Sequence, residues 1–174
     1  MPALEIITAT PAYAEQIADL SRKTFYETFA VSNTAEDMEL FMTKQFSREK
    51  LVAEVSDPSS YFFMALVEGK LAGYLKLQEG EAYPEFDGRS SIEIARIYSD
   101  SAFIGAGIGK ALMQCALEQA ALKKRELIWL GVWEHNLRAI RFYSKWGFEK
   151  FGEHDFILGT DRQTDWLMMR NVEK

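Results

Sequence analysis

The apolar positions in the N-terminal third of the chain mostly follow helical spacing. A short run over residues 4–8 is typical of a strand, and apolar or small side chains then recur every three or four positions from 17 to 28. A second helix is predicted to start near Thr34, because Thr34-Ala35-Glu36-Asp37 resembles a capping box. A third, short helix is predicted around residues 50–55 and ends at Asp57-Pro58. This part therefore predicts one strand followed by three helices.

From residue 61 onwards the hydrophobic period becomes strand-like. The β-rich runs over 61–67 and 71–78 are separated by Glu68-Gly69-Lys70, which indicates a hairpin. Residues 79–90 contain Gly80, Pro84 and Gly88 and are predicted to form a loop. A further strand is predicted over residues 91–98.

The last third of the chain alternates helical and strand patterns. Residues 108–122 are helical, and the near-continuous apolar run over 127–133 is typical of a strand covered on both faces. A helix over 136–146 ends at Gly147, and two more strands are predicted near 148–151 and 165–171. The whole pattern predicts an α/β (α+β mixed) fold in a single domain over residues 1–174, a mixed sheet of about six to seven strands with helices on both faces.

Composition narrows the classes of partner. The chain has 26 acidic and 20 basic residues and a net charge of −6, which argues against nucleic acid and is compatible with a cationic small substrate. Cys115 is the single cysteine, so an intrachain disulfide is excluded and a reducing compartment is expected. We see no signal-peptide pattern and no apolar run of roughly 18 residues, so we expect a cytoplasmic location and no membrane partner.

The segment with the clearest chemistry is rich in glycine. Gly105, Gly107 and Gly109 stand at every second position between the predicted strand 91–98 and the predicted helix 108–122. Glycine leaves the backbone bare and bendable, and amide groups at a helix start bind phosphate oxygens. The segment therefore predicts a phosphate-containing ligand. A glycine-rich turn into a helix, without a ligand, is the alternative interpretation of the loop alone.

Two nucleotide-binding patterns do not fit this segment. A P-loop needs glycine at the position of Ile104 and Ser or Thr at the position of Ala111. A dinucleotide fingerprint needs a small residue at the position of Lys110, together with an acidic residue closing the next strand, and the run 127–133 has none.

A third pattern fits the segment. Q/R-x-x-G-x-G/A, between a strand and a helix, is the pattern of the acetyl-CoA pyrophosphate loop, and the chain here resembles the GNAT superfamily of N-acetyltransferases. Gly107 and Gly109 occupy the glycine positions, while Ile104 stands where the family has Gln or Arg. The resemblance implies that acetyl-CoA is the co-substrate, that no metal is required, and that backbone amides hold the pyrophosphate. The cofactor-binding residues it implies in this loop are Gly105, Ala106, Gly107, Ile108, Gly109 and Lys110.

A second segment resembles the same family independently. Residues 136–148 are similar to the signature N-x-x-A-x-x-F-Y-x-x-x-G-F. The resemblance implies that Asn136 contacts the CoA arm and that the hydroxyl of Tyr143 lies near the thioester sulfur, where it protonates or hydrogen-bonds the leaving thiolate. A tyrosine that only packs in a helix is the alternative interpretation of Tyr143.

The strand over residues 91–98 also has a counterpart in the family. There the strand splays from its neighbour, which implies a splayed central strand pair and pantetheine binding by backbone groups near Ile97 and Tyr98. Glu93 stands 11 positions before Ile104, where some members carry a glutamate general base. An amine acceptor arrives protonated, so a base is needed. A backbone carbonyl with a water chain is the alternative base, and Glu93 is equally interpretable as an ordinary strand carboxylate.

Several further segments are similar to the PaiA-type polyamine N-acetyltransferases. They lie at residues 24–29, 128–134 and 154–165. This similarity implies acetyl transfer to a primary amine, with a polyamine such as spermidine or spermine as acceptor, and it allows a homodimer. Two other functions stay open: an acyl-CoA-binding regulator without turnover, and an N-acetyltransferase acting on peptides or proteins.

The remaining polar residues carry weaker predictions. His135 and His154 do not form a metal set, and each is expected to be a surface or hydrogen-bonding residue, His154 in a late loop. Glu27, Glu36 and Asp37 could attract a polycation, although solvated helix faces explain them as well. Cys115 is expected to be buried and not to act as a nucleophile.

Overall fold

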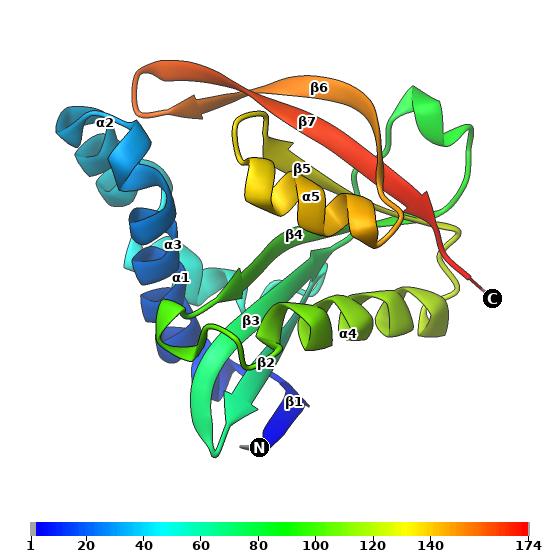
Figure 1. Ribbon diagram of the computed structural model, residues 1–174, viewed down its shortest axis with the longest axis horizontal. Helices are drawn as coiled ribbons and strands as arrows, with labels where there is room; N and C mark the ends of the chain where they lie inside the picture. Colours follow the sequence, from blue (N-terminus) through cyan, green and yellow to red (C-terminus); the bar gives the residue numbers. More distant parts are fainter. Residues whose placement is uncertain (1–2, 174) are drawn as a thin grey trace.

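The computed structural model describes residues 3–173 and arranges them around one seven-stranded sheet (Figure 1). The strands are β1 Leu4–Thr8, β2 Ser60–Val67, β3 Lys70–Gln78, β4 Ser91–Ser99, β5 Leu127–Trp133, β6 Glu149–Leu158 and β7 Asp161–Asn171. Their order in the sheet is β1-β2-β3-β4-β5-β7-β6, and every neighbouring pair is antiparallel except β4 and β5, which are parallel. The mixed sheet expected from the sequence is confirmed.

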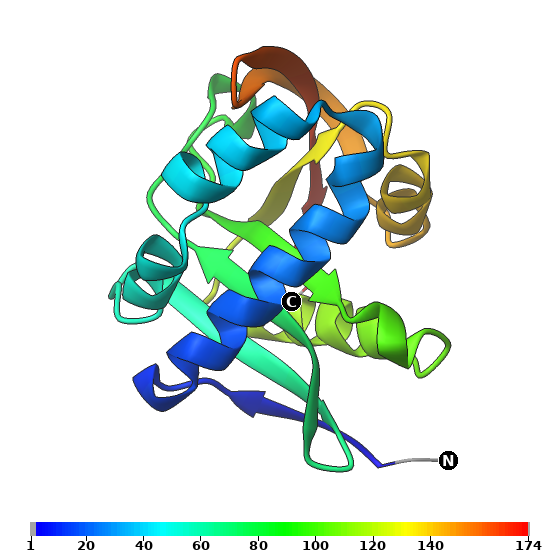
Figure 2. The ribbon, with the colours of Figure 1, turned by 90° about the vertical axis from the view of Figure 1, so that its left-hand side faces the viewer.

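The helices cover both faces of this sheet (Figures 1 and 2). They are α1 Ala14–Phe29, α2 Ala35–Leu40, α3 Arg48–Glu54, α4 Ile108–Leu122 and α5 Leu137–Lys145. On one face Ile17 of α1 packs in a cluster with Tyr74 of β3, and on the other Leu112 of α4 packs against Leu75. The predicted cap of α2 is present, since Asp37 N–H donates to Thr34 Oγ1 at 3.2 Å. Within residues 3–173, no helix combines the length and apolar character needed to cross a membrane.

The two parallel strands in the middle of the sheet pair over only part of their length. Register partners join Ser91–Ile94 of β4 to Leu127–Leu130 of β5, and the pairing stops there. Beyond this point β4 stays paired with β3 through a bulge at Ala95, and β5 stays paired with β7. Because each strand keeps its other neighbour, a gap opens between them, as the resemblance implies.

A glycine lets α4 approach the sheet beside this gap. A Cβ atom on Gly73 of β3 would lie 2.6 Å from Ile108 Cγ2 and 2.6 Å from the backbone oxygen of Tyr98. Any side chain here would push the start of α4 away from β4. Gly73 therefore helps to set the position of the glycine-rich segment that precedes α4.

The last two strands differ from the sequence prediction. β6 and β7 form a long hairpin over Glu149–Asn171, whereas only residues 148–151 and 165–171 were predicted as strands. His154 consequently lies in β6 and pairs with Asp165 of β7, not in a loop as expected. The middle of β6 is mostly exposed and polar, so it lacks the apolar alternation on which the prediction depended.

Candidate functional site

The glycine-rich segment places unpaired amide groups at the start of α4. Gly105 and Gly107 have φ angles of +85° and +78°, which glycine adopts without strain, and Gly107 caps the helix. The first helical bond runs from Ala111 N–H to Gly107 O at 3.1 Å. The amides of the first turn, from Ile108 to Lys110, therefore have no helical partner and can bind an anion. Ile104 is 73% exposed, so its side chain is not needed to build the loop.

Ala106 differs from its neighbours in this loop. Its N–H donates to Phe103 O at 3.2 Å, so this amide is already used within the protein. The residue packs against the main core cluster, and its side chain stabilises the turn. Of the loop residues named from the sequence, Ala106 is thus the least suited to donate to a ligand.

The second sequence motif forms the start and one face of α5. Asn136 caps this helix, and its Oδ1 accepts the N–H of Ala139 at 3.3 Å. The capping bond uses Oδ1, so Nδ2 is the group a ligand could contact. A Cβ on Gly109 would lie 3.6 Å from the ring of Phe142, so α5 packs closely against the start of α4.

The two motifs line one hollow of about 460 Å³ between β4, the glycine-rich segment and α5. The predicted cofactor-binding residues that line it are Ile97, Tyr98, Gly105, Gly107, Ile108, Gly109, Lys110, Asn136 and Tyr143. These predicted residues, which are up to 46 positions apart in sequence, thus face the same space, which local sequence patterns do not show. Glu93 and Ala106 are outside its lining.

A second hollow, of about 390 Å³, adjoins the first across the β4–β5 gap. The two hollows share lining residues that include Ile97, Tyr98 and Tyr143. Aromatic rings from several elements wall the second hollow: Phe25, Phe29, Phe41, Phe46, Trp133 and Phe156. Sequence patterns do not reveal this wall, because its members come from segments that lie far apart in the chain.

Two charged side chains, Arg96 and Asp165, line the aromatic hollow, and each has a charged or titratable partner. Arg96 is held by both carboxylate oxygens of Glu54 in α3, at 2.7 and 2.9 Å, and Lys76 also approaches Glu54 at 3.4 Å. Asp165 of β7 is the carboxylate in the lining. A cationic acceptor entering this hollow would therefore meet aromatic faces and Asp165.

The acidic residues of the first helices have other partners. Asp37 Oδ1 accepts hydrogen bonds from Thr160 N–H and Thr160 Oγ1, at 2.8 and 2.7 Å, and so fixes the tip of the β6–β7 hairpin. Glu27 accepts the hydroxyl of Ser101 at 3.0 Å, and Glu36 is exposed. None of the three lines either hollow, so the structural interpretation of these residues is favoured over a role in attracting a polycation.

Glu93 lies at the closed end of the β4–β5 gap, opposite Trp129. Burial, followed by the repulsion of Glu81, raises the pKa of Glu93 to about 7, although Lys76, His154 and Arg96 oppose this rise. A carboxyl group that titrates near neutral pH is suited to act as a base. Since Glu93 does not line either hollow, it would have to act through water or a neighbouring group.

Tyr143 lies at the junction of the two hollows. Burial, reinforced by the nearby Tyr98, raises the pKa of its hydroxyl well above the ordinary value. Burial also raises the pKa of Tyr98. Both phenols therefore stay protonated at neutral pH, and Tyr143 can donate a hydrogen bond to an anionic leaving group at this junction.

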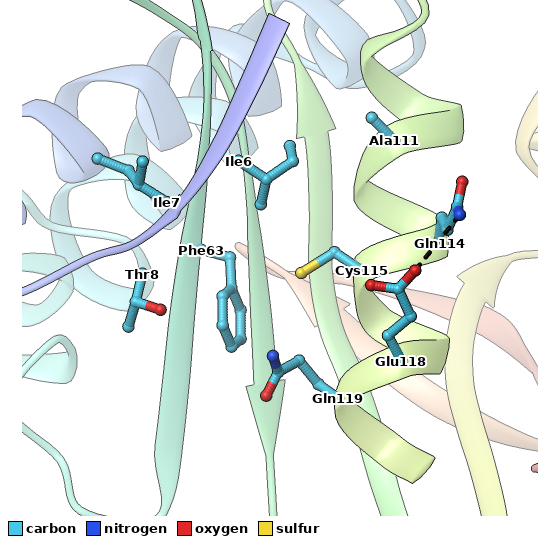
Figure 3. Close-up of a pocket in the computed structure, with 9 residues that line it drawn as sticks. All are labelled: Ile6, Ile7, Thr8, Phe63, Ala111, Gln114, Cys115, Glu118 and Gln119. Atoms are coloured by element: carbon cyan, nitrogen blue, oxygen red, sulfur yellow. Dashed lines mark hydrogen bonds between the residues drawn. The ribbon is translucent and has the colours of Figure 1, made fainter. Parts of the chain in front are cut away.

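A further hollow, of about 350 Å³, lies between β1 and α4, near the β1 edge of the sheet (Figure 3). Cys115 points into it and is partly exposed, whereas the sequence predicted a buried residue. Burial raises the pKa of the Cys115 thiol to about 11, so little thiolate forms at neutral pH and the group is a poor nucleophile. Within residues 3–173, the structure brings no three His, Cys, Asp or Glu side chains together in a way that could hold a metal ion.

Known proteins resemble the chain in sequence and in fold. The model of the acetyltransferase (GNAT) family matches residues 14–148. An uncharacterized N-acetyltransferase of Lactobacillus delbrueckii subsp. lactis is 39% identical over 170 residues, which cover 98% of each chain. The spermine/spermidine N(1)-acetyltransferase of Bacillus subtilis is 32% identical over 90 residues, which cover 51% of this chain and 59% of that protein. The crystal structure of PaiA N-acetyltransferase from Thermoplasma acidophilum with coenzyme A superposes with a TM-score of 0.76 at 22% identity, covering 97% of this chain and 99% of that one.

Proposed function

The chain belongs to the acetyltransferase (GNAT) family and is an acetyl-CoA-dependent N-acetyltransferase, and from this premise we propose that it acetylates a small polyamine such as spermidine or spermine. One observation carries the proposal: two hollows meet at Tyr98 and Tyr143. The first lies beside the free amides of a helix start, and the second has aromatic walls and a carboxylate. Donor and acceptor sites of these two kinds are what the reaction requires.

The residues around the first hollow fit acetyl-CoA. The amides of Gly107 to Lys110 suit a pyrophosphate, and the left-handed glycines leave it room to approach. Backbone groups of Ile97 and Tyr98, on the part of β4 that no longer pairs with β5, suit the amides of the pantetheine arm, and Nδ2 of Asn136 suits the same arm. Acetyl-CoA supplies an activated acetyl group, and this placement would bring the group to Tyr143.

The side chains of the protein contribute acid–base chemistry to the proposed reaction. An alkylammonium with a pKa near that of lysine must lose a proton before its nitrogen can attack a carbonyl. In this proposal Glu93, with a pKa of about 7, takes this proton through water, and a backbone carbonyl with a water chain is the alternative. Tyr143 keeps its own proton and donates a hydrogen bond to the leaving thiolate.

Two observations support a polyamine as acceptor. The aromatic walls of the second hollow can hold an ammonium group over their ring faces while packing against methylene chains, and Asp165 adds a charge partner. The Bacillus subtilis protein that resembles about half of this chain acts on spermine and spermidine, as its name states.

Thiol release from acetyl-CoA, measured with a panel of amines, tests the proposal. We expect the highest kcat/KM with spermidine or spermine, lower values with diamines, and little transfer to amino acids or peptides. Preference for a peptide N-terminus would contradict the polyamine proposal. Binding of acetyl-CoA by calorimetry, without thiol release for any amine, would instead favour a regulator that binds acyl-CoA.

A further inference from the structure

His154 and Asp165 form a pair that lies directly over the β5 backbone. They are register partners on β6 and β7, and His154 Nε2 is 3.3 Å from Asp165 Oδ2. A Cβ atom on Gly131 would lie 3.6 Å from His154 Nε2 and 3.8 Å from Asp165 Oδ2. Both side chains therefore rest against a position where β5 has no side chain. Gly131 is also the first β5 residue beyond Leu130, the last one paired with β4, so the pair sits where the central gap opens.

This pair lies between the aromatic hollow and the solvent. Asp165 and Gly131 line the aromatic hollow. The Asp165 side chain is 16% exposed, whereas the His154 side chain is 41% exposed, so the pair spans the distance from the hollow to the surface. Because Nε2 faces Asp165, Nδ1 is the ring nitrogen left to exchange protons.

The pair also lies on the same face of the sheet as Glu93, because Glu93 is opposite Trp129, and Trp129 and Gly131 are two positions apart on β5. The hydrogen bond to Asp165 raises the pKa of His154 although burial opposes it, and the charges of Asp165, Glu81 and Glu93 raise it further. In turn the charges of His154, Lys76 and Arg96 act on Glu93 to lower its pKa. His154, an imidazole whose pKa is raised, can therefore accept a proton from the Glu93 carboxyl group.

On the basis of the acetyl transfer proposed above, we propose that His154, oriented by Asp165, is the proton outlet of the acceptor site. The acceptor ammonium loses one proton, through water, to the Glu93 carboxylate and becomes a neutral amine. Glu93 then gives this proton, through water, to Nδ1 of His154, and the carboxylate is restored. The resulting imidazolium, stabilised by Asp165, releases the proton to the buffer. One proton moves at each step, and no electron acceptor is needed.

Replacing His154 and adding imidazole tests the outlet. We expect His154→Ala to lower kcat about tenfold or more, short of the roughly 10²–10⁴-fold loss typical of a direct acid or base. The KM for acetyl-CoA should stay unchanged. Imidazole in the buffer should restore kcat in proportion to its concentration, because a free imidazole can carry the same proton.

Two further variants separate proton transfer from structure. His154→Gln keeps a hydrogen-bond donor for Asp165 but cannot titrate, so it should be as slow as His154→Ala. His135→Ala removes the chain's other histidine, whose side chain is 68% exposed, and should keep wild-type kcat with no response to imidazole. Three outcomes would overturn the proposal that His154 is the proton outlet. They are wild-type kcat in His154→Ala, a loss of kcat in His154→Ala that imidazole does not restore, and full activity in His154→Gln. Each of these results requires an active wild-type enzyme, so it is distinct from failure of the proposed function, which would leave the wild type without thiol release.

Discussion

At the scale of single residues, burial raises the pKa of two groups to which the proposed mechanism gives opposite tasks. Glu93 and Tyr143 are both acids whose charged forms burial disfavours. For the carboxyl group this brings the pKa close to neutrality, where it can gain and lose a proton in each turnover. For the phenol it moves the pKa further from neutrality, so the hydroxyl keeps its proton, as the proposed role as a donor requires.

Tyr143→Phe removes this donor and leaves the ring. We expect kcat to fall by roughly 10²-fold, because the leaving thiolate loses its hydrogen bond, while acetyl-CoA affinity changes little. Steady-state kinetics with calorimetric measurement of acetyl-CoA binding checks both. Tyr26→Phe, at a tyrosine that is 54% exposed and outside both hollows, is the matched control and should behave as wild type. Unchanged kcat in Tyr143→Phe would remove this residue from the mechanism.

Glu93→Gln addresses the candidate base through the pH–rate profile. With a pKa of about 7, Glu93 is protonated and inactive as a base below neutrality, so wild-type kcat should rise with pH through about 7. The variant has no titrating carboxyl group here, so it should be slower and should lose this acid limb. A profile with the same limb in both proteins would favour the backbone carbonyl and water chain.

At the scale of elements, local patterns were predictable and long-range ones were not. The glycine-rich segment and the bounds of α4 and β5 followed from local sequence, because capping, glycine and apolar periodicity act over a few residues. The aromatic hollow was not predictable, since Phe25, Phe41 and Phe156 meet only after three separate elements pack. The same holds for His154, whose strand has no apolar alternation and forms because it pairs with β7.

Gly73→Ala tests how the sheet positions α4. The new methyl group would lie 2.6 Å from the backbone oxygen of Tyr98, which cannot move without disturbing β4. We expect a loss of roughly 1–3 kcal/mol in the free energy of unfolding, typical of overpacking, and weaker acetyl-CoA binding. Urea unfolding and calorimetry measure the two. Gly152→Ala is the control, because its Cβ would meet Leu167 at an ordinary 3.6 Å; equal effects of both changes would contradict this account of Gly73.

At the scale of the whole molecule, two half-buried carboxyl groups make stability depend on pH in opposite directions. Burial opposes ionisation of Glu54, but Arg96 and Lys76 outweigh it and lower its pKa below 4.5. Its contribution is therefore present above about pH 4.5 and is lost as the pH falls through the lowered folded-state pKa. The pKa of Glu93 is raised, so the folded state holds its proton more tightly than the unfolded state does. Its ionisation therefore costs stability as the pH rises from about 4.5 to about 7.

These signs predict how Glu93→Gln changes the pH dependence of unfolding. Groups remote from Glu93 contribute similarly in both proteins, so the difference in their free energies of unfolding reports this carboxyl group together with its coupling to His154 and Lys76. Between about pH 5 and pH 8, the free energy of unfolding of the wild type should fall by up to about 3 kcal/mol relative to that of the variant. Because the group is partly exposed and water screens its charge, the measured fall should be smaller than this limit. Urea titrations of both proteins across this range measure the difference. A difference that stays constant with pH would mean that Glu93 ionises as readily in the folded protein as in the unfolded chain, and the argument for Glu93 as a base near neutral pH would then fail.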